Sequence, residues 1–509
     1  MIAPPERPAS GPGHAALSRR LLHGTAWSVA GNIAGQALTF ASTVLVARIL
    51  GRDTFGQLNI INGLIATIGT FAGLGLGLTA TKYVAEFRTS DKIRAARIAC
   101  ALLRLGWWSG LAFTLLLWSA AHFIASRILL SPDLLIPTLI SAPLVAFNTI
   151  GGLQGSLLQG LEKFRLGAFV NVARSGIVAL SVVWACVLWG LNGVIAMMVV
   201  STAATTCWYA RLLRRELATE GIFLARSPIS SEWRILFNFS LPALLAAVLV
   251  SPANWAASAL VARLPNGFSE LGMLAAANHW RQISLLIPIV LTSVLVPVLS
   301  AEHARSGRAE SATYLLDQSH WVSTLIVFPV AVLAMFASEA LIRLYGRDFS
   351  AGGDLIVITC GTAMVISIGT ASGAAIQAQG RMWLGLSINL SYALFLLTGT
   401  ALFAPRYGGR ALAWAAFTSY VLISLWSFHA IRDVLLGGLS GRMYTALLFS
   451  VAMTATCFLV PAPARLWFAP VATLTALSFV VGVLIPKDER ESLRSWITAL
   501  AARLCQSAP

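Results

Sequence analysis

Long apolar runs, each followed by a short polar stretch, repeat along the whole chain. Each run has about 20 residues, the length that an α-helix needs to cross the hydrocarbon layer of a bilayer. The pattern therefore predicts about fourteen membrane-spanning helices. They are expected to begin near Thr25, Gly56, Ile98, Leu134, Leu166, Gly193, Leu236, Leu271, Trp321, Leu355, Trp383, Gly409, Met443 and Leu466.

The composition supports a membrane environment. Of the 509 residues, 57% are hydrophobic and only 11% are charged, whereas an ordinary soluble domain has about 25% charged residues. A protein core cannot absorb so much apolar surface, so lipid must cover part of it. The six cysteines lie singly, without the spacing of a metal site, and we expect neither a metal nor a cofactor. The predicted fold class is an all-α polytopic membrane protein.

Lys and Arg are distributed unequally between the two sides of the predicted membrane. With the N-terminus inside, most of them fall in inside segments, including 82–97 and 211–234. Positive charge stays on the cytoplasmic side, so we expect a multi-pass membrane protein with both termini cytoplasmic. The net charge of +16 does not indicate a nucleic-acid partner, because no soluble module carries a basic patch.

Several residues recur at a fixed distance of 218 positions, which indicates an internal duplication. Gly155, Gln159, Leu166, Gly167, Asn171, Gly190 and Arg214 match Gly373, Gln377, Leu384, Gly385, Asn389, Gly408 and Arg432. Nearer the N-terminus, LVARILGRDTFGQL from Leu45 has a counterpart in LVARLPNGFSELGML from Leu260, which aligns Gly56 with Gly272. Apolar sequences resemble one another by chance, but matched polar residues argue against that explanation.

The duplication predicts two parallel six-helix repeats around a central cavity, followed by two extra C-terminal helices. The expected domains are a disordered cytoplasmic tail at 1–22, an N-lobe of helices one to six at 23–215, a cytoplasmic linker at 216–234, a C-lobe of helices seven to twelve at 235–435, helices thirteen and fourteen at 436–486 and a cytoplasmic tail at 487–509. All connections are short and leave no room for a catalytic domain outside the membrane. We therefore expect a protein that is not an enzyme.

Acidic and basic residues differ in their predicted depth in the membrane. The twenty carboxylates fall in predicted loops, tails or near helix ends, whereas Arg104, Arg174 and Arg281 fall inside predicted spans. A charge in hydrocarbon costs at least about 2.5 kcal/mol, so such a side chain normally faces protein or water. A guanidinium group matches phosphate oxygens. We predict that Arg281 and Arg174 bind an anionic group, although Arg104 and Arg174 could instead extend to the membrane surface.

Uncharged polar residues lie on one face of three predicted helices. The candidate cavity residues beside the two arginines are Asn278, Gln282, Asn32, Gln36 and Asn254. Such residues either line a cavity or hydrogen-bond a neighbouring helix. His279 is a candidate proton relay, and a hydrogen-bonded packing role is the alternative.

Glycines spaced by four residues lie on one face of the second predicted helix, at Gly69, Gly73 and Gly77. This spacing is typical of close helix packing. No predicted strand precedes these glycines, so they do not indicate a phosphate-binding loop.

The stretch WSVAGNIAGQALTFASTVLVARILGRDTFGQLNIINGLIATIGTFAGLGL, from Trp27 to Leu76, resembles the start of the Wzx-type polysaccharide flippases of the multidrug/oligosaccharidyl-lipid/polysaccharide (MOP) exporter superfamily. Its most recognisable part is ARILGRDTFGQ, with Gly51 and the pair Phe55-Gly56 in the family's pattern. The repeat copy at Leu264 to Gly272 departs from that pattern, with Pro265-Asn266 where Leu-Gly is usual.

The resemblance implies that the protein translocates polyprenyl-diphosphate-linked oligosaccharide repeat units by alternating access, for exopolysaccharide, capsule or O-antigen biosynthesis. The implied partners are this lipid-linked oligosaccharide, membrane lipids, and polysaccharide polymerase and export proteins. No strict motif transfers binding residues, so the assignment of Arg281 and Arg174 rests on depth alone.

Four other interpretations are open. A MATE-like drug/cation antiporter needs an ionisable acid within a lobe, and the first predicted helix, 25–47, contains none. A lipid II flippase shares the mechanism and differs in the sugar carried. A membrane polysaccharide polymerase or ligase predicts a long outside loop, which is missing. A structural scaffold leaves the arginines inside predicted spans unexplained.

Overall fold

The computed structural model describes residues 12–223, 249–286, 309–379, 381–432, 439–486 and 489–490. These residues form helices and contain no β-strand. Ten helices in the described part are long and apolar enough to cross a membrane. Two of them, Ile33–Gly73 with 41 residues and Arg165–Thr219 with 55 residues, are each long enough for two crossings. The predicted all-α polytopic membrane fold is confirmed, and about fourteen spans agree with the structure.

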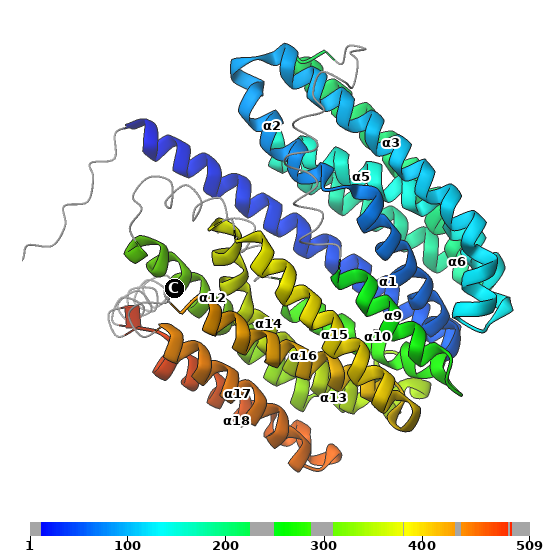
Figure 1. The fold of residues 1–509 in the computed structure, drawn as a ribbon, viewed down its shortest axis with the longest axis vertical. Coiled ribbons are helices and arrows are strands. Elements are labelled where there is room, and N and C mark those ends of the chain that lie inside the picture. Colours follow the sequence, from blue (N-terminus) through cyan, green and yellow to red (C-terminus); the bar gives the residue numbers. More distant parts are fainter. Residues whose placement is uncertain are drawn as a thin grey trace, which may run out of the picture. The chain divides into compact units, whose positions relative to one another are not determined.

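Unit 1 of the chain consists of Met1–Val46 and Leu64–Leu244. Its described helices are α1 (Pro12–Gly73), except for residues 47–63, followed by α2 (Leu76–Ser90), α3 (Lys92–Phe123), α4 (Leu135–Ser141), α5 (Pro143–Gly160) and α6 (Phe164–Thr219), with short turns η1 (Ile124–Ile128) and η2 (Pro132–Leu134) between α3 and α4. α5 packs against α2, α3 and α6 (Figure 1). Leu102, Leu157 and Leu213 are among the buried residues of this core.

Unit 2 consists of Ala47–Gly63 and Leu245–Pro509. Besides the middle part of α1, its described elements are α9 (Val250–Ala262), α10 (Gly267–Ser284), α12 (Ala309–Phe336), α13 (Ser338–Arg343), η5 (Arg347–Gly352), α14 (Gly353–Ala378), α15 (Met382–Tyr407), α16 (Gly409–Ala430), α17 (Leu439–Leu459), η6 (Ala462–Ala464), α18 (Arg465–Phe479) and η7 (Val480–Leu484). α14 contacts α10, α12, α16 and α17, and it is the most deeply buried of the candidate spans among the described residues.

The backbone supports the internal duplication at two pairs of matched positions. Gly190 has φ 57° and ψ −142° within α6, and Gly408 has φ 56° and ψ −134° between α15 and α16. Positive φ favours glycine, so the same residue type makes the same turn in both copies. Lys163 (φ −83°, ψ 52°) precedes α6, and its counterpart Arg381 (φ −76°, ψ 54°) precedes α15. The copies therefore share both their helix starts and their turns.

The helix boundaries differ from the predicted ones in a few places. α1 begins at Pro12, inside the predicted tail, and is interrupted at Gly51, where φ is 73° and ψ is 170°. This interruption separates the first two predicted helices. The predicted start of the seventh helix at Leu236 lies outside the described residues.

A close backbone contact joins the middle part of α1 to α10 within unit 2. A Cβ atom added to Gly56 would overlap the carbonyl oxygen of Phe268, and one added to Gly272 would overlap that of Arg52. Gly56 and Gly272 are the positions that the duplication aligns. The two helix backbones can approach this closely only because both residues lack a side chain.

The glycines of the second predicted helix behave differently from one another. A Cβ atom at Gly77 would lie 2.9 Å from Ser156 Oγ, whereas one at Gly69 or Gly73 would have no atom within 4 Å. The predicted close packing is therefore wrong for Gly69 and Gly73. Both line an open cavity beside α5 instead.

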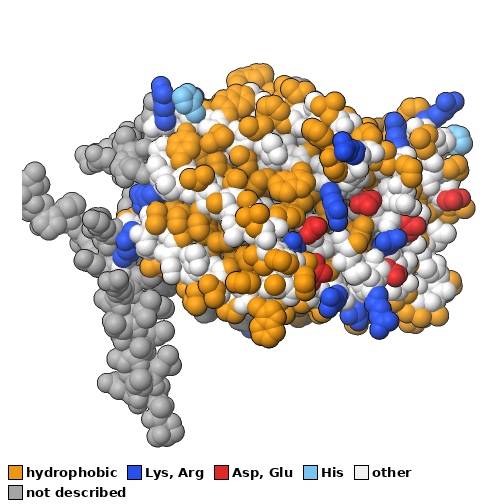
Figure 2. Space-filling view, turned by 90° about the horizontal axis from the view of Figure 1, so that it is seen from below, with side chains coloured by type: hydrophobic (Ala, Val, Ile, Leu, Met, Phe, Trp, Pro, Cys, Tyr) orange, Lys and Arg blue, Asp and Glu red, His pale blue; other side chains and the backbone are white. Residues whose placement is uncertain are grey.

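Large apolar side chains cover much of the surface. Among the exposed ones are Trp107, Leu180, Trp383 and Trp467. Figure 2 shows one face covered largely by hydrophobic side chains, with charged side chains gathered mainly toward its ends. Such a surface is stable in contact with lipid and would be unstable in water.

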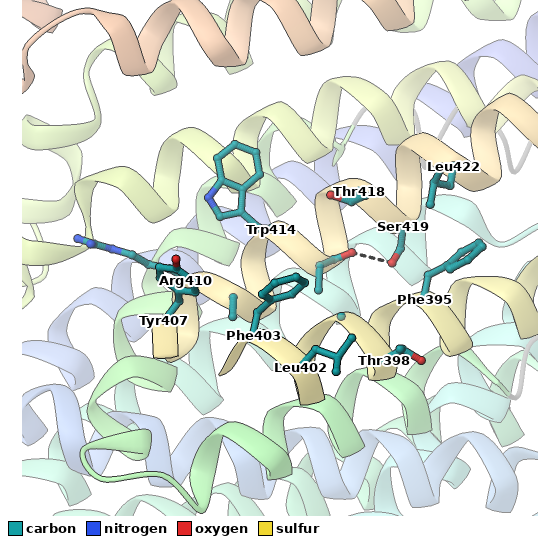
Figure 3. A pocket seen from close by; sticks show the side chains of 13 residues that line it. Phe395, Thr398, Leu402, Phe403, Tyr407, Arg410, Trp414, Thr418, Ser419 and Leu422 are labelled. Carbon is teal, nitrogen blue, oxygen red and sulfur yellow. Dashed lines mark hydrogen bonds between the residues drawn. The ribbon is translucent and has the colours of Figure 1, made fainter. Parts of the chain in front are cut away.

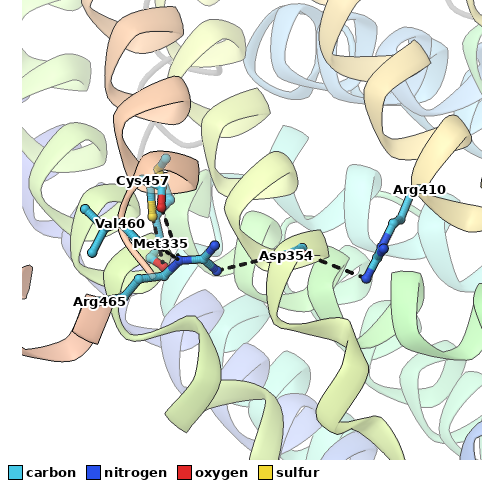
Figure 4. A network of polar contacts seen from close by, with 6 residues as sticks. All are labelled: Met335, Asp354, Arg410, Cys457, Val460 and Arg465. Carbon is cyan, nitrogen blue, oxygen red and sulfur yellow. Dashed lines mark hydrogen bonds and ion pairs between the residues drawn. The ribbon is translucent and has the colours of Figure 1, made fainter. Parts of the chain in front are cut away.

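A polar network holds α18 to α14 within unit 2 (Figure 4). Arg465, which is 4% exposed, donates from Nε to the carbonyl oxygens of Cys457 and Val460 and from Nη1 to Asp354 Oδ1 at 3.1 Å. Asp354 Oδ2 also lies 3.6 Å from Arg410 Nη2. One carboxylate therefore balances a buried guanidinium group and a more exposed one.

Asp354→Asn is expected to lower the free energy of unfolding by about 2–3 kcal/mol, because it leaves the buried Arg465 charge without a counterion. Thermal unfolding of the purified protein in detergent measures the change. Asp348→Asn is the matched control, since Asp348 is exposed at the same end of α14. Equal stability of the two variants would show that Asp354 contributes nothing as a counterion.

Candidate functional site

A polar cavity in unit 1 surrounds Arg174. It has a volume of about 180 Å³ and lies between α5 and α6. Its lining residues are Gly151, Gly155, Leu158, Gln159, Lys163, Gly167, Ala168, Val170, Asn171, Arg174 and Tyr209. No Asp or Glu is among these lining residues, so the cavity has a positive lining without a carboxylate.

The Arg174 side chain is held by α5. Its Nη2 atom donates to Asn148 Oδ1 at 3.1 Å. A Cβ atom at Gly151 would lie 3.3 Å from Nη1, so the glycine leaves space for the guanidinium group beside the α5 backbone. Arg174 is half-buried, and no carboxylate pairs with it in the described part of the chain. A neutral amide fixes its position and leaves its charge uncompensated.

Lys163, the other cation of this cavity, is compensated. Its Nζ atom lies 2.9 Å from Glu220 Oε1 and 3.3 Å from Glu216 Oε2. The hydrogen bond to Glu220 raises the pKa of Lys163, and the same bond lowers the pKa of Glu220. Both groups therefore stay charged at neutral pH and neutralise each other. Arg174 carries the positive charge that the cavity offers to a ligand.

Arg281 lies on α10 in unit 2. It is half-buried, and its Nε atom is buried without a hydrogen-bond partner in the described structure. Cys360 of α14 and Tyr392 of α15 lie within range of its charge. No carboxylate among the described residues forms an ion pair with it. A buried donor without a partner is costly, and an anionic ligand would satisfy it.

Asp317 is a carboxylate at the start of the apolar span Leu316–Phe336. Asp317 of α12 is largely buried and forms an ion pair with Arg442 of α17 at 3.0 Å. The charges of this pair cancel, so the pair does not offset the charge of Arg174 or Arg281.

The other candidates on α10 lie in different surroundings. Asn278 is half-buried and Gln282 is exposed. The ring of His279 stacks on that of Tyr345, with ring centroids 6.4 Å apart and an interplanar angle of 7°, and it also lies near Phe55. Its Nδ1 atom is 3.5 Å from Tyr345 Oη, a long distance for a hydrogen bond. These contacts place His279 in an aromatic cluster.

The remaining candidates lie on α1 and α9. Asn254 donates from Nδ2 to the Val250 carbonyl oxygen at 2.7 Å and accepts from Tyr392 Oη at 3.0 Å. It therefore joins α9 to α15. Gln36 of α1 is exposed, and the side chain of Asn32 lies outside the described part of the structure.

An apolar groove of about 550 Å³ runs between α15 and α16 (Figure 3). Phe395, Leu402, Phe403, Trp414 and Leu422 line it, and Figure 3 shows the Arg410 side chain extending away from them. That guanidinium group already pairs with Asp354. The groove suits apolar chains better than anions.

The residues that surround the two arginines are not evident from the sequence. Asn148 and Tyr209 beside Arg174, and Tyr392 beside Arg281, lie on other helices or on distant turns of the same helix. The duplication indicates one of these residues, Tyr392, because it is the counterpart of Arg174 in the second repeat.

Sequence comparison assigns the chain to a family. The family described as "Polysaccharide biosynthesis protein" matches residues 21–303, more than half of the chain. The chain is 19% identical over 411 residues to the EPS I polysaccharide export inner membrane protein EpsE of Ralstonia solanacearum, covering 77% of this chain and 89% of the relative. It is 21% identical over 429 residues to the protein of the same name from Ralstonia nicotianae, with the same coverage.

Solved structures with a similar fold include a lipid flippase and a multidrug transporter. The lipid II flippase MurJ in an inward closed conformation has a TM-score of 0.66 at 13% identity, covering 90% of this chain and 99% of that chain. An inward-facing multidrug resistance MATE family transporter of the MOP superfamily has a TM-score of 0.65 at 15% identity, covering 78% of this chain and 95% of that chain. The chain belongs to the polysaccharide biosynthesis protein family, and its fold is that of the MOP-superfamily transporters.

Proposed function

We propose that the protein is a flippase that moves polyprenyl-diphosphate-linked oligosaccharide repeat units across the bacterial inner membrane for export as polysaccharide. The family and the names of its two relatives support a role in polysaccharide export. The observation that carries the proposal is the Arg174 cavity, in which a guanidinium group is fixed by an amide and has no carboxylate partner among the described residues.

A lipid-linked diphosphate carries negative charge that cannot enter hydrocarbon alone. Arg174 offers a planar set of donors that matches phosphate oxygens. Arg281 offers a second charge, with one buried donor atom that lacks a hydrogen-bond partner in the described structure. We propose that Arg281 is assisted in binding the diphosphate by Asn278, Gln282 and Asn254. Each guanidinium group would replace water that a bound diphosphate loses.

The proposed mechanism is alternating access between the two sides of the membrane. The headgroup binds from the cytoplasm while the polyprenyl chain stays in lipid, and the two repeats then rock so that the headgroup faces the other side. Gly56 of α1 and Gly272 of α10 occupy aligned positions of the two repeats. The two helices touch at these glycines within unit 2. This contact would form in one state and open in the other. No bond in the substrate is made or broken, so the protein acts as a carrier and not as an enzyme.

Deleting the gene in its native host tests this function. The expected result is loss of surface polysaccharide, with accumulation of the polyprenyl-diphosphate-linked oligosaccharide in the membrane. Thin-layer chromatography of extracted lipids, before and after complementation, measures that accumulation. Unchanged polysaccharide with a new sensitivity to cationic drugs would contradict the proposal and favour an antiporter. Loss of peptidoglycan synthesis would instead favour a lipid II flippase.

A further inference from the structure

A second cavity, in unit 2, corresponds to the Arg174 cavity through the duplication. It has a volume of about 270 Å³ and lies between α14, α15 and α16. Lining positions of the first cavity match lining positions of the second at the same offset of 218: Gly151 with Gly369, Gly155 with Gly373, Leu158 with Ile376, Gly167 with Gly385, Val170 with Ile388, and Asn171 with Asn389. The two cavities therefore come from the same ancestral site.

The two cavities differ in charge. The position of Arg174 is occupied by Tyr392, and the position of Tyr209 by Ser427. The residues that line the unit 2 cavity in the described structure include no Lys, Arg, Asp or Glu. Their polar members are Thr370, Ser372, Asn389, Tyr420, Ser424 and Ser427. This cavity is neutral, and hydroxyl groups supply most of its polar side chains within a largely apolar lining.

Three of the hydroxyl groups are available to a ligand only as acceptors. Thr370 Oγ1 donates to the Ser367 carbonyl oxygen at 2.7 Å, Ser372 Oγ donates to that of Gly369 at 2.8 Å, and Ser427 Oγ donates to that of Ile423 at 2.7 Å. Each hydroxyl has one proton, which its own helix now uses, and its remaining lone pairs can only accept. Such a lining favours ligand O–H groups. It disfavours a phosphate, whose oxygens at neutral pH also only accept.

An aromatic side chain forms another part of the lining. Tyr420 packs against Tyr392, with ring centroids 4.7 Å apart. Tyr392 is fixed in turn, because its hydroxyl donates to Asn254 Oδ1 at 3.0 Å. An ordered ring can pack against the C–H face of a pyranose. A ring and several acceptors around one small cavity match the chemistry of a saccharide.

We propose that the unit 2 cavity is a subsite for an uncharged sugar residue of the cargo. This inference rests on the proposed function and adds to it a neutral subsite in the second repeat. The chemical class of ligand for the second cavity is a neutral, hydroxyl-bearing saccharide.

Binding of two lipids to the purified full-length protein tests the inference. One probe is undecaprenyl diphosphate, which has no sugar. The other is the undecaprenyl-diphosphate-linked saccharide extracted from the membranes of the deletion host. Native mass spectrometry gives the affinity of each probe, with a zwitterionic phospholipid as the baseline.

The double variant S424A/S427A is expected to weaken binding of the saccharide-bearing lipid about tenfold, which is the effect of losing one to two neutral hydrogen bonds. It should leave undecaprenyl diphosphate unchanged. Ser419→Ala is the matched control, since Ser419 lies on the same helix but lines the apolar groove and donates to the Ala415 carbonyl oxygen. It should change the affinity of neither lipid. Arg174→Gln should lower the affinity for both lipids by the same factor.

The outcomes separate the two proposals. Suppose that the wild-type protein binds undecaprenyl diphosphate, and that S424A/S427A lowers the affinity for both lipids equally or for neither. The sugar subsite is then refuted and the flippase proposal stands. If the wild-type protein binds neither diphosphate lipid above the baseline, the flippase proposal falls, and the subsite falls with it.

Discussion

Arg174→Gln is expected to lower polysaccharide export at least about 100-fold while the protein remains folded in the membrane. Removing one partner of a buried, charge-assisted contact costs about 3–5 kcal/mol, because the other charge is left unpaired. Here that other charge is the diphosphate. The loss should therefore appear in transport, since no carboxylate of the described structure depends on Arg174.

Lys163→Gln is the matched control, because Lys163 lines the same cavity but is neutralised by Glu216 and Glu220. It should retain most of the export. Arg174→Lys keeps the charge without the planar donors and should retain part of it, and Arg281→Ala should cause a loss like that of Arg174→Gln. Surface polysaccharide is measured per molecule of protein in the membrane. Normal export by a well-expressed Arg174→Gln strain would remove the basis for an anionic cargo.

Gly272→Leu is expected to abolish export, and Gly272→Ala to lower the free energy of unfolding by about 1–3 kcal/mol. A side chain at this position overlaps the Arg52 carbonyl oxygen, so the middle part of α1 and α10 must move apart. The proposed transport cycle needs this contact to form. Export assays and thermal unfolding in detergent measure the two effects.

Gly69→Ala controls for the loss of glycine in a helix. A Cβ atom at Gly69 has no atom within 4 Å, so this variant should gain up to about 1 kcal/mol from reduced backbone entropy in the unfolded chain. The two substitutions thus have opposite expected signs. Equal thermal stability of both variants would show that the Gly56–Gly272 contact is not tight in solution.

The sequence predicts the fold well because lipid imposes a simple rule on it. Each crossing needs about 20 apolar residues, so hydrophobic runs reveal the spans directly. Gly190 and Gly408 were visible as matched residues, and the structure shows the same positive φ at both. Glycine spacing was less informative. It places Gly69 and Gly73 on one face but does not indicate whether another helix lies against that face.

The candidate site could be predicted only in part. Depth in the membrane selects Arg174 and Arg281, because an arginine within an apolar run is rare and easily seen. Their partners depend on packing between helices that are distant in sequence, as with Asn148, 26 residues before Arg174. His279 shows the same limit, because nothing around it in sequence indicates that its ring stacks on Tyr345.

Arg174 and Tyr392 occupy corresponding positions of the two repeats, and their difference has an evolutionary consequence. A gene encoding a single six-helix copy would give a homodimer, in which any mutation appears twice and both halves of the binding surface stay identical. Joining two copies in one gene removes that constraint. The cavity of one copy can become basic while the matching cavity of the other stays neutral, so a tandem gene can recognise two chemically different groups of a cargo, which a symmetric dimer cannot do without compromise.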